Sequence, residues 1–241
     1  MSVLIISGTG TGIGKTVVTA ALAALAAAAG QRVAVVKPAQ TGIDTGEETD
    51  LDAVRRLSGV TDVHELARYP DPLSPEAAAR TAGTEPLDLA AAARYVGGLA
   101  TTRQRVLVEG AGGLLVRYDP SGRTIADLAA MLAAPVLVVT AAGLGTLNHT
   151  TLTLEALAAR GLDCAGVVIG SWPEKPGLAE RSNLIDLAHL ARGGPAGGGP
   201  AGGGAVLGIT GVDGGLGRLP EGAGQLGREE FLDLARANLR F

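Results

Sequence analysis

The sequence is poor in aromatic residues, which make up 2% of its 241 positions, and it contains a single cysteine. Because Cys164 has no partner within the chain, no internal disulfide can form, and we expect a reducing compartment. The longest apolar run, residues 17–29, is mostly alanine and too short to cross a bilayer. The N-terminus lacks the basic region of a signal peptide. These absences predict a cytoplasmic protein with no membrane partner.

The charge balance argues against a nucleic-acid partner as well. The formal net charge is −4, so lysine and arginine are not in excess for binding a phosphate backbone or an acidic membrane surface. Hydrophobic residues nevertheless form 46% of the chain. With so few aromatic rings, the core must be built from alanine, valine, leucine and isoleucine. A chain of this length is long enough to bury a full sheet.

Short valine- and isoleucine-rich runs alternate along the chain with longer alanine- and leucine-rich segments. Strands are predicted at 3–7, 33–36, 105–108, 136–139, 165–169 and 205–209. Helices are predicted at 16–29, 51–57, 76–82, 87–99, 124–132, 147–159, 178–190 and 228–239. This alternation predicts an α/β fold with one doubly wound, mostly parallel sheet and helices on both faces. We expect residues 1–241 to form a single domain that carries a flexible Gly/Pro/Ala-rich insert at about 193–204.

The strongest local signal is the segment Gly8-Thr-Gly-Thr-Gly-Ile-Gly-Lys15-Thr16, which lies between the first predicted strand and the first predicted helix. A glycine-rich loop between strand and helix is the context of a phosphate-binding loop (P-loop). Its glycines let backbone N–H groups converge on one anion, beside the positive end of the helix dipole. Lys15 can reach terminal phosphates, and the Thr16 hydroxyl can bind Mg²⁺. Although Gly8 stands one residue farther from Gly14 than in the strict motif, the context predicts a nucleotide site.

Charged side chains end two further strands, and in a doubly wound sheet ligands bind beyond the carboxyl ends of the strands. Lys37 would either face the same crevice as Lys15 or extend into solvent at the start of a loop. Glu109 stands where P-loop proteins often keep the acidic residue of the metal site. Asp50 begins a predicted helix, and the residues alone favour a helix cap for it. Thr16, Asp50 and Glu109 together would supply the oxygen ligands that Mg²⁺ takes from a protein.

Residues 144–148 (Leu-Gly-Thr-Leu-Asn) precede a predicted helix. Their free N–H groups could hold a carboxylate, but an ordinary threonine or asparagine cap explains the same residues equally well. His149 beside them is more typical of a helix surface than of a catalytic base. Cys164 adjoins a strand, as an inert core thiol does. The sequence has no zinc-type cluster of His, Cys and carboxylates and no nucleophile elbow.

Taken together, these motifs resemble the dethiobiotin synthetase family, the ATP-dependent carboxylases of biotin synthesis. The matching residues, in the family's order between positions 3 and 171, are the loop 8–16, Lys37-Pro38 with Thr41-Gly42, Asp50, Val108-Glu-Gly-Ala-Gly-Gly113 and Leu144-Gly-Thr-Leu-Asn-His149 followed by Leu152-Thr-Leu. The family uses the longer glycine spacer found here. The resemblance implies a P-loop NTPase fold, a homodimer with one domain per subunit, and a cyclo-ligase.

The resemblance also implies the chemistry. CO₂ would add to one amine of 7,8-diaminopelargonic acid to give a carbamate, ATP with Mg²⁺ would phosphorylate the carbamate, and the second amine would close the cyclic urea. The carbamate and the transferring phosphoryl group are both anionic, and two lysines with Mg²⁺ would stabilise them. By their positions, Lys37 would hold the carbamate and Lys15 the γ-phosphate.

The implied site residues fall into three groups. The nucleotide would be bound by Gly12, Ile13, Gly14, Lys15, Thr16, Val17, Asp50, Glu109, Gly110, Ala111, Gly112, Gly170, Ser171, Gly211, Val212 and Asp213. The diamine would be bound by Thr11, Lys37, Thr41, Pro72 and Leu73 and, where its carboxylate tail reaches across the dimer, by Leu144, Gly145, Thr146, Leu147 and Asn148. The metal would be bound by Thr16, Asp50 and Glu109.

The chain departs from the family pattern after the strand predicted to end at Ile169. Many members carry an Asn-Asp pair there, whose asparagine reads adenine, whereas this chain has Gly170-Ser171. That contact with adenine is therefore absent here. The resemblance implies ATP as the co-substrate, but these residues leave other nucleoside triphosphates open.

Three other functions are compatible with a P-loop in such a fold. A deviant-Walker partition-type ATPase carries an extra lysine where this chain has Thr9-Gly10-Thr11. A regulatory module that only binds nucleotide has no need of Lys37 or of the turn at 144–148. A cobyrinic-acid-type amide synthase needs an amidotransferase cysteine, and Cys164 is badly placed to be one. The residues count against all three.

Overall fold

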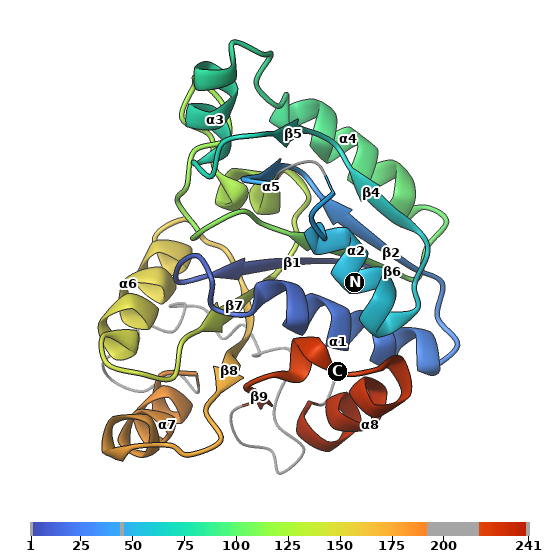
Figure 1. The fold of residues 1–241 in the computed structure, drawn as a ribbon. Coiled ribbons are helices and arrows are strands. Elements are labelled where there is room, and N and C mark those ends of the chain that lie inside the picture. The colour runs from blue at the N-terminus through green and yellow to red at the C-terminus, as the bar shows by residue number, and fades with distance from the viewer. Residues whose placement is uncertain (1, 44–45, 192–216, 240–241) are drawn as a thin grey trace.

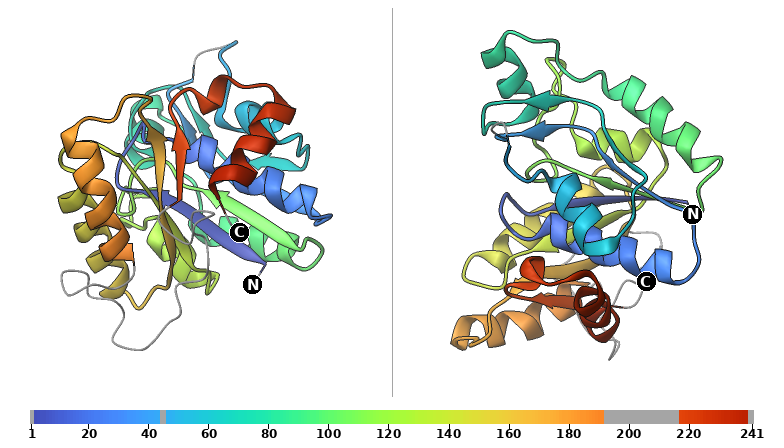
Figure 2. Two further views of the ribbon diagram at one scale, coloured as in Figure 1. Left: turned by 90° about the horizontal axis from the view of Figure 1, so that it is seen from below. Right: turned by 45° about the vertical axis from the view of Figure 1, so that its right-hand side comes forward.

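The computed structural model describes residues 2–43, 46–191 and 217–239 (Figures 1 and 2). The strands of its central sheet are β1 (Val3–Gly8), β2 (Val33–Lys37), β4 (Val63–Glu65), β6 (Arg105–Glu109), β7 (Val136–Thr140), β8 (Cys164–Trp172) and β9 (Gly217–Pro220). They lie in the order β4-β2-β6-β1-β7-β8-β9, and every neighbouring pair is parallel. A separate parallel pair is formed by β3 (Gln40–Thr41) and β5 (Arg68–Tyr69). The predicted fold class is confirmed.

Helices cover both faces of the sheet. They are α1 (Lys15–Ala28), α2 (Asp50–Ser58), α3 (Pro75–Ala82), α4 (Leu89–Ala100), α5 (Ile125–Met131), α6 (Thr146–Ala158), α7 (Leu178–Ala191) and α8 (Arg228–Asn238), with a 3₁₀ turn η1 (Ala223–Gln225) before α8. One core layer joins the sheet to α1, α2 and α8, and the other joins it to α3 through α7 (Figure 1). This arrangement is the doubly wound one that the alternation of strands and helices predicts.

Residues 3–6 of β1 are all apolar because both faces of the strand are buried. Val3 and Ile5 belong to one core layer, and Leu4 and Ile6 to the other. Because successive side chains of a strand point to opposite faces, a sheet covered on both faces needs apolar residues at every position.

The structure contains several short strands that were not predicted from the sequence. The strands β3, β4, β5 and β9 have only two to four residues each, too few for an apolar run to stand out. β8 continues past its predicted end, because Trp172 pairs with Pro220 of β9 beyond a register shift. The insert predicted at 193–204 and the strand predicted at 205–209 lie outside the described residues. Among the described residues, no helix has the length and apolar character needed to cross a bilayer.

The P-loop packs directly on β8 at Gly170. A Cβ atom added to Gly170 would overlap the carbonyl oxygen of Ile13 and lie 2.7 Å from Val139 Cγ1. Gly14, next to Ile13, has φ 92 and stands at the N-cap of α1. The loop and the strand therefore touch through backbone atoms, and a side chain at position 170 must displace the loop.

We therefore expect Gly170→Ala to lower the free energy of unfolding by about 1–3 kcal/mol, the usual range for overpacking. Because the P-loop must shift, the affinity for a nucleoside triphosphate should fall in parallel. Thermal denaturation and titration calorimetry measure the two effects. Gly98→Ala is the matched control: nothing lies within 4 Å of its added Cβ in α4, so it should stabilise the protein by about 0.5–1 kcal/mol. An unchanged nucleotide affinity in Gly170→Ala would contradict the proposed displacement.

Candidate active site

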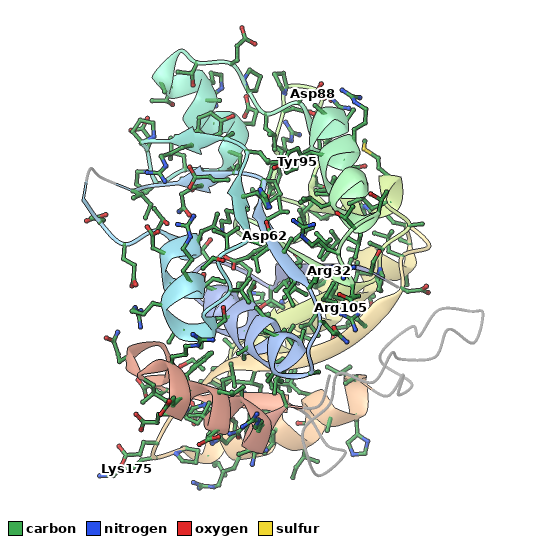
Figure 3. The ribbon with its side chains drawn as sticks, turned by 90° about the vertical axis from the view of Figure 1, so that its right-hand side faces the viewer. Arg32, Asp62, Asp88, Tyr95, Arg105 and Lys175 are labelled. Atoms are coloured by element: carbon green, nitrogen blue, oxygen red, sulfur yellow. The ribbon has the colours of Figure 1, made fainter. Side chains whose placement is uncertain are left out.

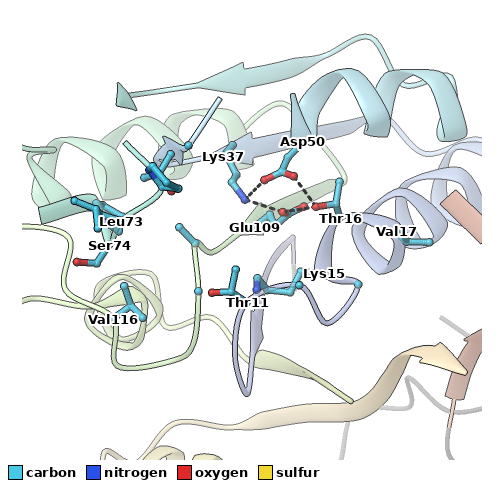
Figure 4. A pocket seen from close by; sticks show the side chains of 18 residues that line it. Thr11, Lys15, Thr16, Val17, Lys37, Asp50, Leu73, Ser74, Glu109 and Val116 are labelled. Carbon is cyan, nitrogen blue, oxygen red and sulfur yellow. Dashed lines mark hydrogen bonds and ion pairs between the residues drawn. The ribbon is translucent and has the colours of Figure 1, made fainter. Parts of the chain in front are cut away.

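A cavity of about 780 Å³ opens at the carboxyl ends of β1, β2 and β6 (Figure 4). The residues that line it are Thr11, Gly12, Gly14, Lys15, Thr16, Val17, Lys37, Thr41, Gly42, Asp50, Pro72, Leu73, Ser74, Pro75, Glu109, Ala111, Gly112 and Val116. They come from the P-loop and α1, the loop after β2, the start of α2, the turn into α3 and the loop after β6. This is the edge of an open α/β sheet at which ligands bind.

Lys15, the first residue of α1, folds back over the P-loop. Its ammonium group donates a hydrogen bond of 2.7 Å to the carbonyl oxygen of Gly10. Burial and the nearby positive charge of Lys37 lower the pKa of Lys15 to about 8, against the opposing attraction of Glu109 and Asp50. The charge available to a phosphate here is therefore sensitive to pH.

Lys37 occupies the centre of a buried ionic cluster (Figure 4). Its side chain is 4% exposed, and its ammonium nitrogen lies 2.5 Å from Asp50 Oδ2 and 2.8 Å from Glu109 Oε1. A longer hydrogen bond of 3.4 Å reaches the carbonyl oxygen of Gly110. An ammonium group has three protons, so all of them have acceptors within the protein.

Thr16 joins the same cluster. Its hydroxyl lies 2.9 Å from Asp50 Oδ1 and 3.0 Å from Glu109 Oε1, and its single proton can serve only one of them at a time. Burial by itself lowers the pKa of Lys37, but the charges of Glu109 and Asp50 and their hydrogen bonds raise it above its usual value. Burial raises the pKa of Asp50, but Lys37 and the Thr16 hydroxyl outweigh this effect and lower it. Lys37 and Asp50 are therefore both charged at neutral pH.

The prediction that Asp50 caps a helix is wrong. The N-cap of α2 is Thr49, which forms a capping box with Asp52. Asp50 follows as the first helical residue, and its carboxylate turns to Lys37 and Thr16. The Thr49 side chain accepts a hydrogen bond from the backbone N–H of Asp52, and the Asp52 side chain accepts one from that of Thr49. The Asp50 carboxylate does not cap the helix and faces the cavity.

Thr16, Asp50 and Glu109 fit a Mg²⁺ ion. A hydroxyl and two carboxylates are the hard oxygen donors that this ion prefers. Glu109 Oε2 is buried without a hydrogen-bond partner, and a cation would satisfy such an orphaned acceptor. In the part of the chain that the structure describes, no three His, Cys, Asp or Glu side chains are grouped to hold a metal. Two carboxylates suit Mg²⁺, which keeps water and phosphate ligands.

Several residues predicted for the site do not line this cavity. Ile13 packs against the core beneath the P-loop, and Gly110 contributes only its carbonyl oxygen to Lys37. Gly170 supports the P-loop through its backbone, and Ser171 is exposed at the end of β8. Residues 211–213 lie outside the described part of the chain.

Residues 144–148 lie at the start of α6, apart from the cavity of the same chain. Leu144 is 90% exposed, whereas Thr146 is buried. The Thr146 hydroxyl donates to the carbonyl oxygen that follows β7. Thr140 must therefore donate to Thr146, and Thr150 to Thr140, each over 2.7 Å. This directed chain of hydroxyl groups ties the first turn of α6 to the end of β7.

Ser74, Pro75 and Val116 line the cavity but were not predicted from the sequence. In the proline-rich turn at 69–75, only Pro72 and Leu73 were predicted to bind the substrate. No local pattern marks Val116, whose place depends on the path of the loop after β6.

The chain is similar to known proteins in its sequence and in its fold. A family model described as an AAA domain matches residues 2–192. The ATP-dependent dethiobiotin synthetase BioD of Frankia casuarinae is 60% identical over 240 residues, covering 100% of this chain and 92% of that protein. A protein of the same name from Rhodococcus jostii is 59% identical over 231 residues, covering 96% and 91%. The kinase domain of the Escherichia coli tyrosine kinase ETK shares the fold, with a TM-score of 0.51 at 16% identity, covering 73% of this chain and 69% of that one.

The low pKa of Lys15 predicts proton uptake when a nucleoside triphosphate binds. Phosphate groups favour the charged lysine, so binding near or above pH 8 should draw a proton from solution. Below about pH 7 the lysine is already charged, so uptake should vanish and affinity should level off. Calorimetry in two buffers of different ionisation enthalpy measures the uptake. Lys15→Arg keeps its charge throughout this range and should show none; uptake that persists in this variant would assign the proton to another group.

Proposed function

This chain belongs to the ATP-dependent dethiobiotin synthetase family, and we propose on that premise that it closes a cyclic urea on 7,8-diaminopelargonate, using CO₂, ATP and Mg²⁺. The observation that best supports the proposal is that Lys15 and Lys37 line one cavity together with two carboxylates. The proposed enzyme is cytoplasmic and has one catalytic domain per subunit.

The proposed reaction has three steps. One amine of the substrate adds to CO₂ and loses a proton, which forms a C–N bond and a carbamate anion. A carbamate oxygen then attacks the γ-phosphorus of ATP, ADP leaves, and a carbamic-phosphoric anhydride forms. The second amine attacks the carbamoyl carbon and loses a proton, and the C–O bond to phosphate breaks as the ring closes. Negative charge develops on oxygen at each stage, where fixed cations in a shielded cavity stabilise it.

Lys37 is proposed to hold the carbamate and Lys15 the γ-phosphate. Because every proton of Lys37 already has an acceptor, Lys37 must release Asp50, Glu109 or Gly110 before it can donate to a new anion. Bound to Thr16, Asp50 and Glu109, Mg²⁺ would supply positive charge to the phosphate oxygens. With the two carboxylates neutralised in this way, Lys37 is available to the substrate. Thr11, Thr41, Pro72 and Leu73 line the part of the cavity assigned to the diamine.

The substrate's carboxylate tail is proposed to reach residues 144–148 of a second subunit in a homodimer. Two observations support this assignment. These residues lie outside the cavity of their own chain, and Leu144 is almost fully exposed at the start of α6. An exposed helix N-terminus offers free N–H groups to a carboxylate.

A product assay tests the reaction. We expect a cyclic urea, detected by mass spectrometry, only when diaminopelargonate, bicarbonate, Mg²⁺ and a nucleoside triphosphate are all present. Supplying each triphosphate in turn also tests the choice of base. Hydrolysis of nucleotide without a urea product would contradict the proposal and leave a nucleoside triphosphatase, whereas binding without turnover would leave a nucleotide-binding module.

Lys37→Met should lower product formation by about 100-fold or more, as removal of a charge-stabilising group usually does. Nucleotide affinity should change little, because the P-loop is intact. Loss of the buried cation also costs about 3–5 kcal/mol of stability, so folding is checked by calorimetry, and Lys37→Arg, which keeps the charge, serves as a second variant. Lys175→Met is the matched control, because this lysine is exposed at the surface (Figure 3) and does not line the cavity.

Mixing two inactive variants tests the shared site. Lys37→Met removes the cation proposed to hold the carbamate, and Asn148→Asp places a negative charge against the substrate's carboxylate tail. The two changes damage different subunits of each proposed site, so one site of every mixed dimer is intact. Random exchange should restore about a quarter of the wild-type rate. Recovery of no activity, with exchange confirmed by differently tagged subunits, would place the tail-binding residues elsewhere.

A further inference from the structure

Tyr118 is a buried residue directly behind the cavity wall. It is 0% exposed and among the largest fully buried side chains of the described residues. Its backbone N–H donates to the carbonyl oxygen of Arg123 at 2.8 Å, next to a bridge between Arg117 and Thr124. The ring belongs to the core layer that contains Ile125. Tyr118 lies in the same connection between β6 and α5 as the residues that it touches, but the core layer and the bridge before α5 hold its ring in place.

The hydroxyl of Tyr118 accepts a hydrogen bond of 2.6 Å from the backbone N–H of Ala111. Ala111 belongs to the loop that follows β6 and lines the cavity together with Gly112. Burial raises the pKa of Tyr118 to about 12, so the group is an uncharged hydroxyl at neutral pH. A phenylalanine ring would fill the same space but leave the Ala111 N–H without a partner.

The same loop carries an acceptor of Lys37. The carbonyl oxygen of Gly110, one residue before Ala111, lies 3.4 Å from the Lys37 ammonium nitrogen. The Gly110 N–H donates to Ile6 of β1. A Cβ added to Gly110 would meet Ile125 Cγ1 at 3.3 Å and the Tyr118 hydroxyl at 3.6 Å. The loop is therefore confined between the sheet on one side and Tyr118 with Ile125 on the other.

We propose that Tyr118 is a positioning residue for the reaction, because its hydroxyl fixes the loop 110–112 that forms the cavity wall and carries an acceptor of Lys37. The proposal rests on the function proposed above. Tyr118 touches neither nucleotide nor diamine in this scheme; it acts through Ala111 and, one residue before it, Gly110. If this wall moves, the orientation of the Lys37 ammonium group toward the carbamate changes. The P-loop keeps its position.

Tyr118→Phe tests the proposal, with Tyr69→Phe as the matched control. Tyr69 is also a buried tyrosine, and its hydroxyl donates to one backbone carbonyl oxygen, that of Glu85, at 3.3 Å. It faces a different cavity, of about 410 Å³, beside α4. Both variants should melt a few degrees below the wild type. Only Tyr118→Phe should lower kcat, by about 10- to 100-fold, as small misplacements of catalytic groups do; KM for the nucleotide should stay within a factor of about two.

A second readout does not depend on the reaction. Amide hydrogen exchange at Ala111 should accelerate in Tyr118→Phe and remain unchanged in Tyr69→Phe. Unaltered exchange at Ala111 overturns the proposal whether or not the protein makes a cyclic urea. Faster exchange with an unchanged kcat overturns it too, because Tyr118 would then only stabilise the fold. Absence of a urea product from the wild type would instead contradict the proposed function.

Gly110→Ala provides an independent variant, in case Tyr118→Phe does not fold. It keeps the Tyr118 hydroxyl but pushes the loop away from Ile125. We expect the same fall in kcat, larger than any change in the nucleotide KM. A normal kcat in Gly110→Ala, with a loop shown by exchange to have moved, would mean that the position of this wall does not matter to the reaction.

Discussion

The candidate site depends on the burial of one ammonium group between two carboxylates. Charged groups leave water only at high cost, and a buried cation is tolerated only when its partners are close and well aligned. Lys37 meets this condition with Asp50 and Glu109 at hydrogen-bonding distance. Because the three residues come from β2, α2 and β6, the same contacts that prepare the cavity also hold three separate segments of the fold together.

The order of the strands makes this cluster possible. β2, β6 and β1 are neighbours in the sheet although about 70 residues separate Lys37 from Glu109 in the chain. All three strands are parallel, so Lys37, Glu109 and the P-loop emerge at the same edge. Helices on both faces bury almost all of β1, β2 and β6 and leave their carboxyl ends as the place where polar groups can gather.

Much of this site could be predicted from the sequence, because each central residue follows an apolar strand. The P-loop, Lys37 and Glu109 were identified in this way, and their meeting at one edge follows from a parallel sheet. The role of Asp50 was misjudged from the residues alone, since a carboxylate at a helix start looks the same whether it caps the helix or faces a cavity. The structure shows that Thr49 is the N-cap of α2, so Asp50 is not the capping residue.

Other residues could not be found in this way. Tyr118 and Val116 owe their positions to the path of a loop packed between the sheet and α5, and neither stands in a recognisable pattern. The short strands β3, β4 and β5 exist through pairing with distant segments more than through their own composition. In such places long-range packing, which a single sequence does not display, determines the structure.

The chain of threonine hydroxyls at α6 has a thermodynamic consequence. Thr140 and Thr146 hold the first turn of that helix to the sheet, while Leu144 beside it projects into solvent. A surface that is already ordered loses little conformational entropy when something docks on it, so more of the contact energy remains as affinity. The start of α6 is therefore already ordered in the free protein, before any partner binds to it.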